Sequence, residues 1–290
     1  MSAVNAVKAG EENEFTTTHH VYEPHKAGLP PLSPYIRELW RRREFAKELS
    51  SSTMKAANSM TLFGQIWLVL NPLMLAGVYY VLVDVLSTKE RGWDYFAHLT
   101  AGLFTFYFVA GSMSTGAGSV VAGGKLLMNT AFPRLLMPLS AVRTAFFRYL
   151  PTLPIYFVFH LLAGNPIRWQ TLTALPFLVM LITFAAGLAA LFATLQVYFR
   201  DTSAFLPYFI RIWLYLSPVI WLVTEVPQSM EKVIQFNPLY PILGGFTEAL
   251  VTGTVPAWPL WIEGALISTF VFIAGSLFFM SREREFAVRL

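Results

Sequence analysis

The feature that most constrains this chain is its series of long apolar stretches, separated by short charged islands. The hydrocarbon core of a bilayer is about 30 Å thick, and a helix that rises about 1.5 Å per residue needs roughly 20 residues to cross it. Six stretches are that long, and they lie at about 62–83, 98–121, 139–163, 171–198, 204–223 and 258–280. Lipid offers no partner for backbone polar groups, so crossing segments of this kind must be helical. We therefore predict an all-α integral membrane protein with six transmembrane helices.

Composition supports this class. Hydrophobic residues make up 55% of the 290 residues and charged residues only 13%, whereas a soluble domain carries about a quarter charged residues. The run from Leu172 to Pro218 is too long for one crossing, and the pair Arg200–Asp201 interrupts it. The pair predicts a tight turn between the fourth and fifth spans. The alternative is one very long helix with a buried ion pair, which costs several kcal/mol unless its geometry is excellent.

The basic residues are distributed unequally across the predicted spans. Of the 21 Lys and Arg residues, 17 fall on the side that carries both termini. Because Lys and Arg accumulate on the cytoplasmic side, both termini are predicted to be cytoplasmic. Residues 1–32 are polar and predict a disordered tail. Residues 33–56 predict a basic amphipathic helix, and residues 57–290 predict the six-span domain.

Three segments outside the predicted spans allow more than one interpretation. The helix at 33–56 fits either a cationic anchor at the lipid headgroups or a surface helix that also contacts a cytoplasmic partner. The segment 122–140 is semi-apolar, which favours a short helix in a protein groove over a simple loop. The segment 224–257 holds apolar pieces too short to cross between Pro and Gly breakers. It predicts a re-entrant helical hairpin shielded by protein, with a surface cap as the alternative.

The chain offers little for catalysis. Cysteine is absent, which excludes disulfides and thiolate chemistry. The stretch GSVVAGGKL (118–126) resembles a phosphate loop, but Lys125 is followed by Leu126 and the glycine spacing is wrong. No metal motif is present, and His160 fits an ordinary bundle histidine. We therefore expect neither a catalytic site nor a cofactor in this chain, and no nucleic-acid partner.

Two arginines lie about ten residues inside predicted spans, Arg148 in the third and Arg211 in the fifth. Each alone fits snorkelling towards the interface. Together they fit a site for an anionic headgroup such as a diphosphate. Aromatic residues form 16% of the chain, and a fraction lining an internal path would stack on sugar rings. The candidates for that path are Phe104, Phe106, Tyr107, Phe108, Tyr208, Phe209, Trp213 and Tyr215.

Three motifs in register carry a family resemblance. The first is TLFGQIWLVLNPLM (61–74), the second is VYFRDTSAFLPYFIRIWLYLSPVIW (197–221), and the third is FNPLYPI (236–242). From about residue 35 to its end, the chain resembles the membrane subunit of bacterial ABC exporters for lipid-linked polysaccharides. That group serves O antigens, capsules, teichoic acids and actinobacterial galactan. Overall likeness favours the mycobacterial-type galactan exporter.

The resemblance implies partners that the residues alone do not reveal. Such permeases work as homodimers with two separate ATPase subunits, which hold ATP and Mg²⁺. The N-terminal helix and the segment after the second span contact the ATPase, which implies interface roles for Arg41, Arg42, Arg43, Phe45, Lys125, Leu127, Phe132 and Arg134. The hairpin acts as an external gate, which implies gate roles for Glu225, Asn237, Pro238, Tyr240, Glu248 and Glu263. Leu135 stands where members often carry an acid, so this contact is expected to be mostly apolar.

The leading functional expectation is a transporter subunit in the bacterial inner or plasma membrane, without enzymatic activity of its own. It would move a polyprenyl-diphosphate-linked glycan outward, driven by ATP hydrolysis in the partner. A drug or lipid efflux permease is the alternative within the same class. A membrane polyprenyl-phosphate sugar transferase is less well supported, because Asp201 is nearly alone as an acid at the predicted inner face.

Overall fold

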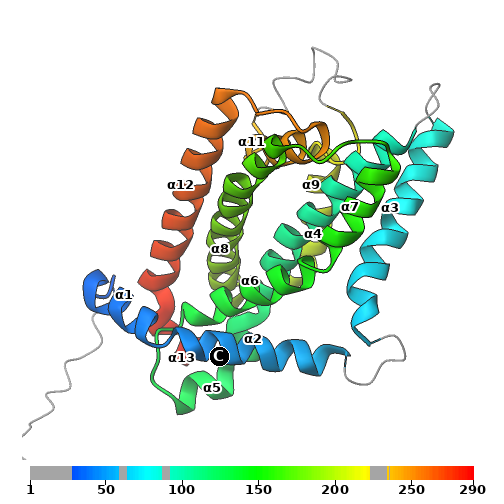
Figure 1. Cartoon of the computed structure of the whole chain (residues 1–290). Coiled ribbons are helices and arrows are strands. Elements are labelled where there is room, and N and C mark those ends of the chain that lie inside the picture. Colours follow the sequence, from blue (N-terminus) through cyan, green and yellow to red (C-terminus); the bar gives the residue numbers. More distant parts are fainter. Residues whose placement is uncertain (1–27, 59–63, 87–91, 223–233, 235) are drawn as a thin grey trace, which may run out of the picture.

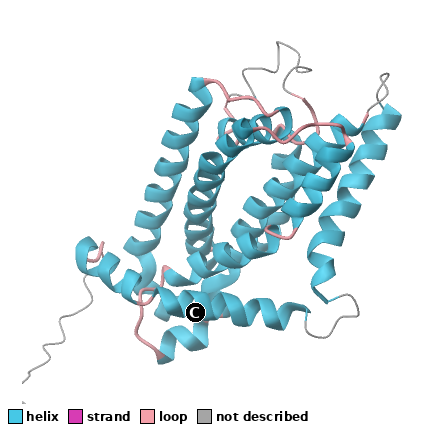
Figure 2. Ribbon diagram, viewed as in Figure 1, coloured by secondary structure: helices cyan, strands magenta, loops and turns pink. Residues whose placement is uncertain are grey.

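The computed structural model describes residues 28–58, 64–86, 92–222, 234 and 236–290. Helices form all the regular structure in these residues (Figures 1 and 2). In chain order they are α1 (Leu32–Arg41), α2 (Arg43–Asn58), a 3-10 turn (Gly64–Ile66), α3 (Trp67–Leu86), α4 (Trp93–Ala122), α5 (Gly124–Asn129), α6 (Leu136–Tyr149), α7 (Thr152–Leu162), a 3-10 turn (Trp169–Thr173), α8 (Ala174–Tyr198), α9 (Thr202–Leu216), α11 (Tyr240–Thr247), a π-helical turn (Glu248–Thr252), α12 (Trp258–Arg282), a 3-10 turn (Glu283–Glu285) and α13 (Phe286–Arg289).

The centre of the bundle is α4, most of whose residues are buried. It packs against α6 on one side and α8 on another, and α8 packs in turn against α12. The backbones of α8 and α12 touch where Gly187 meets Gly275, because a Cβ atom on either glycine would overlap the facing main chain. Small residues allow this close approach, which is typical of helix packing in membranes. At the other edge of the bundle, α3 is nearly unburied, with Ala76 as its one buried residue.

The prediction of an all-helical membrane protein is confirmed in its coarse form. Among the described residues, five helical segments are long and apolar enough to cross a membrane, at Trp67–Leu86, Trp93–Ala122, Leu136–Leu162, Trp169–Tyr198 and Trp258–Arg289. The six-span count is not confirmed, because the predicted fifth span corresponds to α9, which has only 15 residues. This helix ends at Leu216 because Ser217 precedes Pro218, and a residue before proline is disfavoured in the helical conformation.

The turn at Arg200–Asp201 is confirmed. Both residues are exposed and lie between the end of α8 and the start of α9. Backbone N–H groups of Thr202 and Phe205 donate to the carbonyls of Phe199 and Asp201, each at 3.0 Å, which closes the turn. The alternative of one continuous helix with a buried ion pair is therefore wrong.

The predicted hairpin at 224–257 is only partly described, since residues 223–233 and 235 lie outside the described residues. The described part is one helix, α11, which continues into the π-helical turn and ends at Gly253. Gly253 has a φ of +60°, a left-handed conformation that favours glycine. The segment α11 lies across one end of the bundle, in contact with α4, α8 and α12 (Figure 1). Its backbone is shielded by protein, but a two-helix hairpin is not confirmed.

The opposite end of the bundle is called here the α2 end. The helices that lie there, near the start of α6, are α1, α2, α5 and α13 (Figure 1). The structure corrects the single helix predicted at 33–56, because α1 stops at Arg41 and α2 starts at Arg43. The interruption has a physical reason: the two halves dock on different parts of the body. Tyr35 on α1 contacts Glu283 in the 3-10 turn that follows α12, whereas α2 packs along α6.

Candidate functional site

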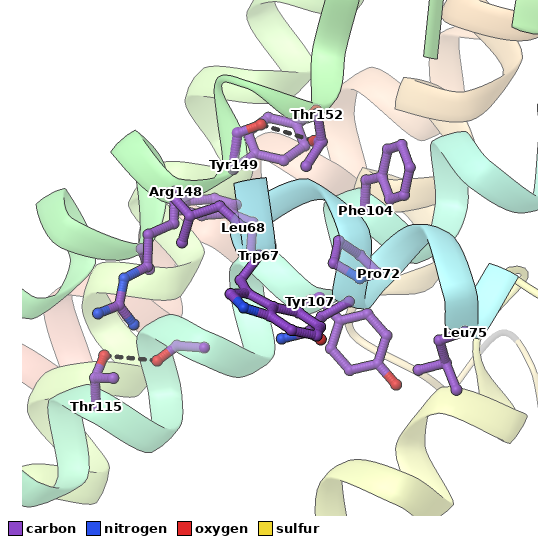
Figure 3. A pocket seen from close by; sticks show the side chains of 14 residues that line it. Trp67, Leu68, Pro72, Leu75, Phe104, Tyr107, Thr115, Arg148, Tyr149 and Thr152 are labelled. Atoms are coloured by element: carbon purple, nitrogen blue, oxygen red, sulfur yellow. Dashed lines mark hydrogen bonds between the residues drawn. The ribbon is translucent and has the colours of Figure 1, made fainter. Parts of the chain in front are cut away.

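A cavity of about 310 Å³ opens between α3, α4 and the α6–α7 segment (Figure 3). That volume is at the lower end of the roughly 300–1,000 Å³ typical of ligand sites. The walls are mostly apolar or aromatic, with a few polar groups among them. The lining residues are Trp67, Leu68, Asn71, Pro72, Leu75, Phe104, Tyr107, Phe108, Gly111, Thr115, Ala145, Arg148, Tyr149 and Thr152.

One face of α3 forms the outer wall of this cavity. Trp67, Asn71 and Leu75 are four residues apart in sequence, so they share that face. Pro72 sits inside the helix and has no N–H group, so the carbonyl of Leu68 lacks its usual helical donor. Four residues of the first family motif line the cavity, namely Trp67, Leu68, Asn71 and Pro72. The motif therefore marks a wall of this cavity.

Arg148 is the charged group of the cavity. It is the thirteenth of the 27 residues of the span Leu136–Leu162, which places it near the middle of that span. Its side chain extends from α6 towards Thr115 of α4 (Figure 3). The Thr115 hydroxyl donates to the carbonyl of Gly111 at 2.6 Å. Within the described part of the chain, Arg148 makes no hydrogen bond and no ion pair.

The structure divides the aromatic residues predicted to line a sugar path. Phe104, Tyr107 and Phe108 line the cavity. Phe106 and Trp213 lie in the core, with exposed fractions of 1% and 7%. Tyr208 and Tyr215 lie on the exposed surface of α9, and Phe209 packs its ring against Trp213 at 5.5 Å between centroids. These residues therefore do not form one continuous lining.

The two predicted anion-binding arginines lie in different places. Arg148 lines the cavity, whereas Arg211 is exposed on α9 and is absent from the lining. The structure thus places Arg148 in the cavity and Arg211 outside its lining.

Asn237, predicted as a gate residue, is the centre of a buried hydrogen-bond network. Its Oδ1 accepts from Trp213 Nε1 at 2.8 Å and from the Leu239 N–H at 3.0 Å. Its Nδ2 donates to the Leu216 carbonyl and to Ser217 Oγ, both at 3.0 Å. All four hydrogen-bonding positions of the amide are filled. The network joins the end of α9 to the start of α11, so the second and third family motifs meet here.

The other predicted gate residues are not gathered at one point. Pro238 is exposed, Tyr240 is half-buried, and Glu263 is exposed on α12. Glu248 is half-buried at the start of the π-helical turn, and burial raises the pKa of its carboxyl group although Thr254 opposes the shift. Glu225 lies outside the described residues.

At the α2 end, several of the predicted ATPase-contact residues are engaged within the chain itself. The Phe45 and Phe132 rings pack with centroids 4.7 Å apart, and Arg42 Nη1 donates to the Ala131 carbonyl at 2.5 Å. Leu127 is buried in a small core with Phe279 and Phe286. The contacts of Phe45 and Arg42 attach the N-terminal helices to the segment after α4, whereas the Leu127 cluster joins that segment to the C-terminal part of the chain.

The exposed surface of the α2 end carries charges of both signs, because Arg41 Nε lies 3.0 Å from Glu38 Oε2 and Arg43 Nε lies 3.7 Å from Glu44 Oε1. The side chain of Arg41 is 72% exposed, and Arg43 is exposed with its guanidinium 4.9 Å from the centre of the Trp40 ring. The side chain of Lys125 lies outside the described part of the chain. Leu135, expected to offer an apolar contact, is buried and therefore absent from this surface.

Sequence reasoning missed a group of hydrogen bonds at the α2 end, called here the clasp, which joins α1, the segment 134–135 and the turn after α12. Tyr35 Oη donates to Glu283 Oε2 at 2.7 Å and accepts from the Leu135 N–H at 3.4 Å. Arg134 Nη1 donates to the Glu283 carbonyl. Burial and the Glu283 carboxylate raise the pKa of Tyr35, so its hydroxyl stays protonated and donates. The available signal was Glu283, an acid in the charged run SRERE (281–285) after the last span. Its partner Tyr35 is 248 residues away in sequence, so local reasoning could not pair the two.

We expect Tyr35→Phe to release α1 while α2 stays docked. The change removes the donor to a buried carboxylate, at a cost of about 1–3 kcal/mol. The docking of α2 rests on other contacts, such as Thr144 Oγ1 to Ser50 Oγ at 2.9 Å. Hydrogen exchange should therefore speed up for α1 amides and not for α2 amides. Tyr208→Phe, at an exposed position, is the matched control, and equal α1 exchange in both variants would contradict the clasp.

Comparison with known proteins gives the following similarities. No family model matches the chain. Two O-antigen export system permease proteins RfbA of Klebsiella pneumoniae are each 26% identical over 208 residues, which cover 71% of this chain and 80% of theirs. The O-antigen export system permease protein RfbA of Myxococcus xanthus is 23% identical over 255 residues, covering 87% of this chain and 97% of that protein. These similarities confirm the resemblance to permease subunits of polysaccharide exporters that the motifs indicate.

Proposed function

We propose that this chain is the transmembrane subunit of an ABC exporter that moves a polyprenyl-diphosphate-linked polysaccharide from the cytoplasm to the exterior. The observation that carries the proposal is the similarity to O-antigen export permeases, which in one relative extends over 87% of the chain. The five long apolar helices suit a permease. Galactan is the specific glycan that we propose, on the overall likeness of the sequence to the mycobacterial-type exporter.

The proposal includes a separate ATPase as the source of energy. The α2 end presents two exposed arginines, Arg41 and Arg43, on helices that lie across the bundle, and each is ion-paired to a neighbouring glutamate. Because α2 packs on α6, a displacement of α2 by a bound partner would be transmitted to α6, which lines the cavity. We propose that two ATPase subunits bind this end of a permease homodimer in the inner membrane, with both termini cytoplasmic.

Depletion of the chain in its host tests the proposed function. A lipid-linked glycan should accumulate on the cytoplasmic side, and its sugar analysis should show galactan. Accumulation of a different glycan would overturn galactan and keep the export function. Normal surface polysaccharide after full depletion, with altered drug or phospholipid efflux, would favour the alternative efflux permease.

Affinity purification tests the partner. The tagged chain should recover an ATPase with a phosphate-binding loop, and reversing the charge of Arg41 and Arg43 together should reduce that recovery. Arg168→Glu, at the opposite end of the bundle, is the matched control. Recovery of no ATPase, with turnover of a nucleotide sugar by the isolated chain, would instead support a sugar transferase.

A further inference from the structure

The cavity beside α3 holds a cation that has no partner among the described residues. Arg148 is the thirteenth of the 27 residues of the apolar segment Leu136–Leu162, and its side chain is directed into the cavity towards Thr115. Charged side chains inside a membrane pair with one another, with carbonyls or with a ligand. None of the lining residues that the structure describes is acidic. The side chain therefore lacks an internal counter-charge and is oriented into a cavity that has room for one.

The polar groups around Arg148 complete a site for an oxyanion. A guanidinium offers donors in a planar fork that matches phosphate oxygens, and such charge-assisted bonds are the strong ones. The Asn71 side chain faces the same cavity from α3 and makes no hydrogen bond within the described part of the chain. Its amide adds two donors. The site thus offers several donors, with Arg148 and Asn71 contributed by two separate helices.

The remaining walls suit an apolar chain attached to that anion. Leu68, Leu75 and Phe104 line the cavity together with other apolar and aromatic side chains. The outer wall is α3, of which only Ala76 is buried, so one thinly packed helix separates the cavity from the surrounding lipid. A molecule that lies in the bilayer can therefore reach the site from the side, with its chain along α3 and its head at Arg148.

We propose that this cavity binds the phosphate or diphosphate head of a lipid, with Arg148 as the charged ligand and Asn71 as a second donor. Identifying that lipid with the carrier of the exported glycan rests on the proposed function. The phosphate site itself rests on the cavity alone. Both an isoprenoid diphosphate and an anionic bilayer phospholipid carry the required chemistry, so the experiment has to distinguish the two.

Binding is measured on the full chain in phosphatidylcholine nanodiscs, together with any ATPase that co-purifies. The probe is farnesyl diphosphate, followed by tryptophan fluorescence, because Trp67 lines the cavity. Trp67→Phe identifies the part of the signal that comes from the site. We expect saturable binding to the native chain, no competition by farnesol, and affinity about tenfold or more weaker in Arg148→Gln, because a charge-assisted contact is lost.

Two further variants keep the test decisive. Arg148→Lys retains the charge and loses the fork, so its affinity should lie between those of the native chain and Arg148→Gln. Arg168→Gln removes an arginine at the far end of the bundle and should bind as the native chain does. Thermal unfolding of each variant checks that it is folded. Native affinity in a folded Arg148→Gln variant would overturn the proposal, as would equal loss in Arg168→Gln.

Competition separates the two sources of the phosphate. If phosphatidylglycerol fails to displace farnesyl diphosphate, the site selects an isoprenoid diphosphate, which supports the carrier of the glycan. Displacement by phosphatidylglycerol at similar concentrations supports the phosphate site and overturns its assignment to the carrier. The assay does not depend on transport. Depletion that leaves surface glycan unchanged would overturn the proposed function while the binding result stands.

Discussion

Replacing Gly187 by valine is expected to leave almost no folded protein in the membrane. A Cβ atom at this position would lie 2.5 Å from the Val271 carbonyl carbon and 2.6 Å from Phe272 Cα, whereas real Cβ contacts under 3.0 Å essentially never occur. The obstructing atoms are main chain, so no side chain can move aside to make room. Alanine should already cost about 3 kcal/mol, the upper end for overpacking, and valine more.

Gly275 provides a second test of the same contact. A Cβ atom there would lie 2.9 Å from the Gly187 carbonyl carbon, so Gly275→Ala should also separate α8 from α12. Gly118→Ala is the matched control, because its added Cβ would meet nothing within 4 Å. It should be neutral or slightly stabilising, since alanine favours helix by about 1 kcal/mol over glycine. The stability of each glycine variant is measured by thermal unfolding in detergent. An unfolding midpoint of Gly187→Ala equal to that of the native chain would contradict close backbone packing between α8 and α12.

Replacing Asn237 by leucine is expected to have the second-largest effect. Leucine has a similar shape but leaves the Trp213 Nε1 donor and the Leu216 carbonyl without their partners. Each unsatisfied buried group costs about 1–3 kcal/mol, so we expect a total of about 2–6 kcal/mol. The connection between α9 and α11 should loosen first, because the network is what joins them. Limited proteolysis near residues 217–240 and thermal unfolding measure the loss.

Two controls test whether the network acts through Asn237. Ser217→Ala removes only one of the contacts of Asn237 and should cost less than Asn237→Leu. Trp213→Phe combined with Asn237→Leu should be less harmful than the sum of the two changes, because both remove the same hydrogen bond. Strict additivity of the two changes, with the contact between α9 and α11 unaffected, would show that this hydrogen bond contributes nothing to stability.

Sequence reasoning succeeded where one contiguous segment carries the whole signal. The turn at Arg200–Asp201 was predictable because two adjacent charges interrupt an apolar run. The length of α9 was mispredicted although its signal, Ser217–Pro218, was present. The apolar run continues past Pro218, so hydropathy alone does not mark the end of the helix. The helix ends there because the residue before a proline disfavours the helical conformation.

The candidate site was only partly predictable. Arg148 was identified because a charge inside a span is unusual, and the structure places it in a cavity. Asn71 and Trp67 were noticed only as motif residues, since nothing local shows that α3 turns them towards α6. The pairing of Tyr35 with Glu283 lies beyond local reasoning, because the two residues are 248 positions apart.

The sequence alone determined that this chain is helical and where its long apolar helices lie. A bilayer imposes length and apolarity on each crossing segment separately, so these properties are written in consecutive residues. Only the tertiary structure decided that Trp213 is core, that Arg148 faces a cavity and that Asn237 joins two helices. Those outcomes depend on which segments distant in sequence come into contact. Packing between helices determines these contacts, and the residue pattern within a single helix does not.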